Sequence, residues 1–136
     1  MASKDESYVD TSALVAFFDR SDTYHPLFRR LFSQPPPLFT TPLVIAEGHG
    51  WFLRRFDRSR AMQFLAGLEA MTPLAVTAVG AREHAGAAKE IRRFSDQDLT
   101  LTDGLGLYMM RVRDTKECWS TDFHLGLTGV PLVIQR

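Results

Sequence analysis

The sequence contains one cysteine, only three lysines, no net charge and no apolar run that approaches the roughly 20 residues of a membrane span. A single cysteine, Cys118, excludes an internal disulfide and is typical of a protein from a reducing compartment. The polar start, Met-Ala-Ser-Lys-Asp-Glu-Ser, lacks the apolar region of a secretory signal. We therefore expect a cytoplasmic protein without a membrane-spanning segment.

The bulk composition is that of one soluble globular domain. The chain has 136 residues, 45% of them hydrophobic and 24% charged. We expect a single domain over residues 1–136, with residues 1–6 flexible. Sixteen basic residues balance sixteen acidic ones, and thirteen of the basic residues are arginine. Arginine makes bidentate contacts with phosphate better than lysine does, although a genome rich in G and C would produce the same excess.

Segments with strand character alternate with helical segments along most of the chain. The predicted strands are 7–9, 38–40, 74–77, 117–120 and 132–134. The predicted helices are 12–18, 25–33, 42–55, 58–71, 78–94 and 102–113, with a short one at 123–127. This alternation predicts a three-layer α/β/α fold around a central parallel sheet of about five short strands, whose site lies at the carboxyl ends of the strands.

Four acidic residues occupy apolar settings in this pattern. Asp10 and Asp122 each follow a predicted strand directly, and Asp103 completes the capping-box pattern of residues 100–103. Each of these three is also explained as a helix cap. Glu47 is different because it lies about two turns inside a helix, too deep to cap it. A carboxylate among apolar neighbours needs a partner.

Strand ends and helix starts of a parallel sheet meet at one edge, so the four acids can converge there. Their mutual repulsion would require a cation. Carboxylate oxygens are the ligands that Mg²⁺ prefers, and such an ion suits phosphate chemistry. The sequence therefore predicts a divalent-metal site.

Four segments in order resemble the motifs of PIN-domain ribonucleases of the VapC toxin type. They are Tyr8–Leu14 with Asp10, Val44–Glu47, Asp96–Asp103, and Ser120–His124 with Asp122. The resemblance covers roughly Tyr8 to Val133. One departure is that Gly48 and Gly50 follow the second acid inside the predicted helix, where each glycine costs about 1 kcal/mol.

The resemblance implies a PIN-like fold and an endoribonuclease that depends on Mg²⁺ or Mn²⁺. It implies that Asp10, Asp103 and Asp122 are direct or water-mediated metal ligands and that Glu47 completes the catalytic site. Attack by water would leave a 5′-phosphate and a 3′-hydroxyl. It also implies a homodimer, an RNA substrate and a small antitoxin partner that docks on segments 25–32 and 42–56.

Several nearby residues are candidates for supporting roles, each with an ordinary alternative. Ser12 and Ser120 could hydrogen-bond a carboxylate or the phosphate, or serve as caps. His124 could touch substrate, although a surface histidine is the simpler interpretation. Asp98 could be an outer acid, or belong to a solvated loop.

Basic and aromatic residues of the third and fourth predicted helices are candidates for contacts with RNA. A solvated helix junction is the alternative for the arginines, which are Arg54, Arg55, Arg58 and Arg60. Trp51 and Phe52 could stack a base or receive a partner, or pack in the core.

Three other functions remain open at this stage. The chain could be a PIN-domain nuclease or RNA-binding module outside any toxin–antitoxin pair, or a scaffold without turnover, although all four acids are present. A structure-specific DNA nuclease is the third, but 136 residues leave no room for the insertions that would grip a duplex.

Overall fold

The computed structural model describes residues 6–72 and 74–136. The strands in this part of the chain are β1 (Ser7–Val9), β2 (Leu38–Thr40), β3 (Leu74–Val76) and β4 (Cys118–Trp119). The α-helices are α1 (Thr11–Phe18), α2 (His25–Leu31), α3 (Pro42–Arg55), α4 (Arg58–Glu69), α5 (Ala81–Arg93) and α6 (Leu101–Val112). Two 3₁₀ helices follow β4, η1 (Phe123–Gly126) and η2 (Val133–Gln135).

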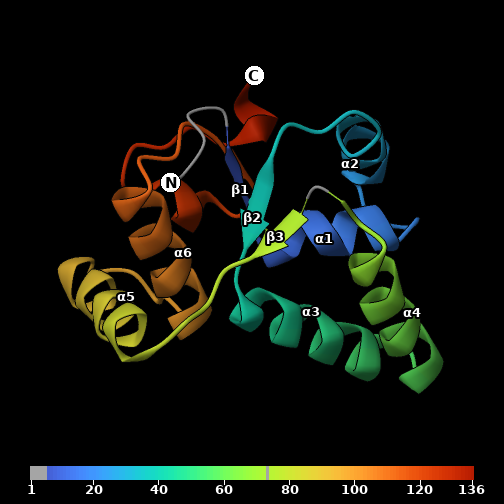
Figure 1. The fold of residues 1–136 in the computed structure, drawn as a ribbon, viewed down its shortest axis with the longest axis horizontal. Coiled ribbons are helices and arrows are strands. Elements are labelled where there is room, and N and C mark those ends of the chain that lie inside the picture. Colours follow the sequence, from blue (N-terminus) through green and yellow to red (C-terminus); the bar gives the residue numbers. More distant parts are fainter. Residues whose placement is uncertain (1–5, 73) are drawn as a thin grey trace.

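The strands form one parallel sheet in the order β3-β2-β1-β4. Helices α1 to α4 lie on one side of this sheet and α5 and α6 on the other (Figure 1). The predicted three-layer α/β/α class is therefore confirmed. Because β1 lies between β2 and β4, with Val9 paired to Trp119, the residues that follow β1 and β4 emerge side by side.

The predicted strand count is wrong, because the sheet has four strands and not five. Residues 133–135 form η2, and only Leu132 makes an isolated parallel bridge to Cys118. The reason is local: Leu132 N donates to Gln135 Oε1 at 3.0 Å, and Gln135 N donates to the Leu132 carbonyl at 2.9 Å. This turn uses the backbone groups that a fifth strand would have paired with β4.

The core fills the space between the sheet and both helical layers. Every residue of β1 and β2 is buried, and Trp119 of β4 packs against Phe28 and Phe32. Helix α3 runs unbroken through Gly48, where an added Cβ would lie 2.5 Å from Phe64 Cζ of α4. The glycine that departs from the family pattern thus lets an aromatic ring pack directly against the helix that carries Glu47.

The N-terminal residues differ in part from the expectation that residues 1–6 are flexible. Of residues 1–6, which we expected to be flexible, residues 1–5 lie outside the described part of the chain. Glu6 is described, and Arg113 donates hydrogen bonds to both of its carboxylate oxygens at 2.9–3.1 Å.

None of the helices in residues 6–72 and 74–136 combines the length and apolar character that crossing a membrane requires.

An ion pair joins the two helices of the second layer. Glu90 of α5 is buried, and Arg111 of α6 donates two hydrogen bonds to it, at 2.6 and 3.1 Å. This contact raises the pKa of Arg111. Arg93 approaches the same carboxylate at 3.8 Å. Because Glu90 is buried while the Arg111 side chain is 40% exposed, the two partners differ in how well water can replace the lost contact.

We expect Arg111→Met to lower the free energy of unfolding by about 2–3 kcal/mol, because it leaves a buried carboxylate with only a distant cation. Glu90→Gln should cost about 1 kcal/mol, since the freed guanidinium reaches solvent. Urea denaturation of the two variants measures the difference. Equal losses would contradict the asymmetry.

Candidate metal centre

The carboxyl edge of the sheet opens into a cavity of about 290 Å³. Its lining comes from the ends of β1 and β4 and from α1, α3 and α6, and it includes all four predicted acids. The lining residues are Asp10, Thr11, Ser12, Val15, Asp22, Glu47, Trp51, Asp103, Thr121 and Asp122. Residues separated by more than 100 positions in the chain therefore share one site.

Asp10 occupies the N-cap position of α1, but its side chain makes no capping hydrogen bond. Instead its Oδ2 accepts hydrogen bonds from the hydroxyls of Ser12 at 3.1 Å and Ser120 at 3.0 Å. Ser120 reaches it because β1 and β4 are neighbours. The Asp10 carboxylate therefore does not cap α1 with its side chain but is held by two serine hydroxyls.

Burial raises the pKa of Asp10 from 3.8 to about 6. Hydrogen bonds from the Thr11 backbone and from the hydroxyls of Ser120 and Ser12 lower this pKa, while the charge of Asp103 raises it. Desolvation is the largest of these effects, since only 4% of Asp10 is exposed. A cation in the cavity would favour the ionised form.

The two serines also hold the loop that follows β4. Ser12 Oγ accepts a hydrogen bond from Thr121 N at 3.0 Å, and Ser120 Oγ accepts one from Asp122 N at 2.9 Å. Their oxygens lie 3.1 Å apart. The serine pair therefore connects the carboxylate after β1 to the backbone that carries Asp122.

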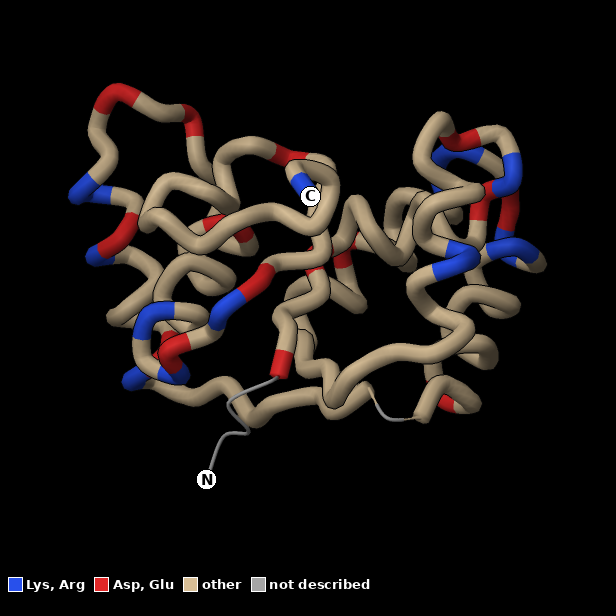
Figure 2. The backbone as a smooth tube through the Cα atoms, turned by 90° about the horizontal axis from the view of Figure 1, so that it is seen from above, with Lys and Arg blue, Asp and Glu red and all other residues tan. Residues whose placement is uncertain are grey.

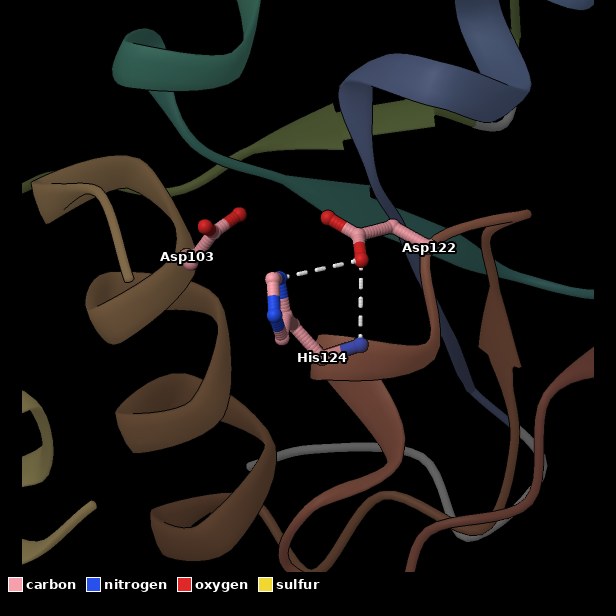
Figure 3. Close-up of side chains that lie close together, drawn as sticks. All are labelled: Asp103, Asp122 and His124. Carbon is pink, nitrogen blue, oxygen red and sulfur yellow. Dashed lines mark hydrogen bonds and ion pairs between the residues drawn. The ribbon is translucent and has the colours of Figure 1, made fainter. Parts of the chain in front are cut away.

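Asp103 is both a cap and a cavity residue. Its N–H donates to Thr100 Oγ1 at 3.1 Å, and its Oδ2 accepts from Thr100 N at 3.0 Å, so the predicted capping box is present. The hydrogen bond to Thr100 engages only one carboxylate oxygen. The side chain points towards Asp122 and His124 (Figure 3), so a cap and a ligand are compatible roles.

Asp122 lies at the start of η1 beside His124. Its Oδ1 accepts a hydrogen bond from His124 N at 3.0 Å and lies 3.2 Å from His124 Nδ1 (Figure 3). Asp103, Asp122 and His124 each offer a ligand atom within 4.8 Å of the others. This group could hold a metal ion. It contains His124, which we predicted from the sequence only as a possible substrate contact.

Glu47 lies on α3, half-buried, and lines the same cavity. The hydrogen bonds and ion pairs among residues 6–72 and 74–136 do not include its carboxylate. The partner that a carboxylate needs in this setting would have to come from a ligand or from water.

The other predicted residues lie elsewhere. Asp98 is exposed in the loop before α6, and it is not among the residues that line this cavity. The four arginines are also outside it, and Arg60 stacks on Phe56 with its Cζ 4.2 Å from the ring centroid. Figure 2 shows that most lysines and arginines lie towards the two ends of the molecule.

Two polar lining residues that were not predicted, Asp22 and Thr11, bear on the site. Asp22 lies between α1 and α2, and its Oδ1 accepts a hydrogen bond from Tyr24 N at 2.8 Å. Thr11 carries a buried hydroxyl that has no hydrogen-bond partner among the described residues. Asp22 lies two residues before Tyr24, the N-cap of α2, and this Asx-turn position is the sequence signal that could have drawn attention to it.

The residues present fit a hard divalent cation. The cavity offers several carboxylates and the buried hydroxyl of Thr11, which has no partner among the described residues, and the His124 imidazole lies beside Asp103 and Asp122. Carboxylates suit both Mg²⁺ and Mn²⁺.

This parallel sheet with an acidic cavity at its carboxyl edge defines the chain as an α/β protein with a candidate cation site. The sequence model of the PIN domain matches residues 7–116, and the chain belongs to the PIN domain family. The resemblance to PIN-domain proteins is thereby confirmed. The match includes Asp10, Glu47 and Asp103 and stops before Asp122, so the case for Asp122 rests on geometry.

Several solved structures are similar to this chain, and two of them bear on its fold. One is the crystal structure of Mycobacterium tuberculosis VapC20, described as a toxin that cleaves the sarcin-ricin loop. It is 23% identical with a TM-score of 0.81, and the alignment covers 90% of this chain and 95% of that one. The other is a toxin–antitoxin complex from Klebsiella pneumoniae, 14% identical with a TM-score of 0.63, covering 93% and 95%. No curated protein matches the chain. Both likenesses show the fold.

Proposed function

We propose that this protein is an endoribonuclease that depends on Mg²⁺ or Mn²⁺ and cleaves RNA phosphodiester bonds. The observation that carries the proposal is that Asp10, Glu47, Asp103 and Asp122 line one cavity in a PIN-domain chain. A bound divalent ion would supply a Lewis acid that neutralises the phosphate and lowers the pKa of an attacking water.

The side chains around that cavity have different roles in this proposal. Asp103 and Asp122 would hold the ion, and His124 is near enough to join them. Asp10 adds a carboxylate that Ser12 and Ser120 orient. Glu47 accepts a hydrogen bond from water and positions it for in-line attack. The products would carry a 5′-phosphate and a 3′-hydroxyl.

We further propose that the enzyme is the toxin of a toxin–antitoxin pair and that it acts as a homodimer. The likeness to VapC20, described as a toxin, and to a toxin–antitoxin complex supports the toxin part of this proposal. A second cavity, of about 600 Å³, offers space for part of such a partner, and of the expected docking segments 25–32 and 42–56 only Phe56 lines it. It lies at the end of α1 against α4, and its lining includes Phe18, Arg20, Phe56 and Arg60.

The test is incubation of the purified chain with RNA in Mg²⁺, in Mn²⁺ and in EDTA. We expect cleavage with either ion, none in EDTA, and none with Asp103→Asn, whose amide is a poor ligand but keeps the capping geometry. Sequencing the fragment ends checks the predicted 5′-phosphate. If the parent and Asp103→Asn cleave equally, the site assignment is wrong.

A growth assay separates the toxin from a nuclease outside any such pair. We expect expression in bacteria to arrest growth, and co-expression of a small protein encoded beside it to restore growth. Cleavage in vitro without growth arrest would refute the toxin role and leave the nuclease proposal standing.

A further inference from the structure

Trp51 forms part of the wall of the acidic cavity. Trp51 lines it together with Val15, so an apolar surface faces the carboxylates. The indole is half-buried and meets the rings of Phe52 and Phe56 edge-to-face, with centroids 4.9 and 6.0 Å away. Phe52 is buried at 1% exposure and belongs to the core. The two aromatics that the sequence left undecided therefore differ: Phe52 packs inside and Trp51 borders the site.

Residues of three kinds follow one another along the same face of α3. Glu47 and Trp51 are four residues apart and Arg54 follows three later, so all three share that face. Arg54 folds back along the helix, because its Nη1 lies 2.9 Å from where a Cβ at Gly50 would stand. The backbone positions of Glu47, Trp51 and Arg54 thus follow one another at about one helical turn, ~5.4 Å, and the Arg54 guanidinium lies back beside Gly50.

We propose that Trp51 is a substrate-positioning residue that stacks the base next to the scissile phosphate, with Arg54 contacting the following phosphate. This inference rests on the proposed nuclease function and adds the path that the RNA strand takes across the site. Phosphate held at the carboxylates and a base one turn along α3 match the layout of a single nucleotide. Because every base can stack, this contact would set the affinity for RNA and the register of the strand, but it would not select a nucleotide sequence.

A fluorescence experiment tests the stacking directly. The chain has two tryptophans, and Trp119 is buried at 1% exposure beneath α2, so quenching by a ligand reports on Trp51. The probe is single-stranded octaadenylate in Mg²⁺, and the control probe is an octamer of the same backbone without bases. Both are titrated into the full chain carrying Asp103→Asn, which prevents cleavage. We expect quenching by octaadenylate and about tenfold weaker binding of the abasic strand.

Variants of Trp51 and a matched control complete the test. Trp51→Ala should raise KM for RNA about tenfold or more with kcat little changed, because the ring aligns substrate without touching reacting atoms. Trp51→Phe keeps a stacking face and should recover most of the loss. Leu53→Ala removes an exposed side chain, 45% exposed on the same helix and outside the cavity, and should change neither constant. Thermal unfolding checks that each variant folds.

The outcomes separate this inference from the nuclease proposal. Cleavage by the parent with an unchanged KM in Trp51→Ala would overturn the stacking role alone. Octaadenylate that quenches Trp51 while the parent cleaves no RNA would support stacking and overturn the nuclease. If Trp51→Ala weakens only the binding of an antitoxin and not of RNA, the surface serves a protein partner and the stacking proposal is wrong.

Discussion

Replacing Asp10 with asparagine will abolish RNA cleavage and, at the same time, make the metal-free protein more stable at neutral pH. Asp10 is 4% exposed, and burial raises its pKa to about 6. The loss of activity should be at least a hundredfold, since even the residues that orient metal ligands are worth about 10–100-fold. The gain in stability follows from removing a charge that the fold must desolvate.

The sign of the pH dependence follows from proton binding. The folded state holds a proton on Asp10 up to about pH 6, whereas the unfolded chain releases it near the ordinary carboxyl pKa of 3.8. The contribution of Asp10 to stability is therefore fully present below about pH 4 and is lost as the pH rises through 6. At about 1.4 kcal/mol for one pKa unit, the ionised carboxylate costs about 2–3 kcal/mol at pH 7.5.

Denaturation of the metal-free parent and Asp10→Asn at pH 4 and pH 7.5 measures this cost. We expect similar free energies of unfolding at pH 4 and an advantage of about 2 kcal/mol for the variant at pH 7.5. Adding Mg²⁺ should stabilise the parent more than the variant. Asp98→Asn is the matched control, because Asp98 is exposed outside the cavity. A variant that is less stable than the parent at pH 7.5 would show that Asp10 has a structural role instead.

Gly104→Ala will destabilise the fold and displace a predicted metal ligand, because α5 and α6 touch at this residue. A Cβ at Gly104 would lie 2.7 Å from the Ala87 carbonyl oxygen and 2.8 Å from Ile91 Cγ1. A backbone carbonyl cannot rotate away, so the helices must separate. Such overpacking costs about 1–3 kcal/mol. Asp103 is the preceding residue, and we expect its shift to lower cleavage about tenfold or more.

Gly50→Ala is the matched comparison for this prediction. It is also a glycine inside a helix, but its Cβ would meet only the flexible end of Arg54, at 2.9 Å. Alanine favours a helix by about 1 kcal/mol, so Gly50→Ala should be neutral or stabilising. Urea denaturation with cleavage rates separates the two substitutions. If both glycines respond alike, close packing of α5 on α6 does not hold Asp103 in place.

The elements were predictable from local patterns, and their ends were not. Helix α3 begins at Pro42 with Thr41 as its cap, as its sequence indicates, and Thr41 Oγ1 accepts from Val44 N. Helix α5 begins three residues later than predicted, at Ala81, because the Glu83 carboxylate accepts a hydrogen bond from Gly80 N at 2.7 Å. The missing fifth strand has the same origin, since a local turn competed with the sheet.

The cavity was only partly predictable. Motif order placed four acids in one site, and the sheet brings their elements together. Sequence spacing could not distinguish a cap from a free carboxylate. In the structure the Asp10 carboxylate accepts hydrogen bonds from two serine hydroxyls and does not cap α1. Asp103 caps α6 with one carboxylate oxygen, and its side chain faces Asp122. Asp22 and Thr11 line the cavity, although neither was predicted to be a site residue.

By itself, the sequence determined the α/β alternation and membership of the PIN domain family, because periodicity and motif order are local properties of the chain. Only the tertiary structure decided which side chains meet. Pairing of β1 with β4 brings Ser120 to Asp10 across 110 residues, and the start of α6 brings Asp103 within reach of His124. Such contacts depend on strand order and helix packing, which no spacing along the chain encodes.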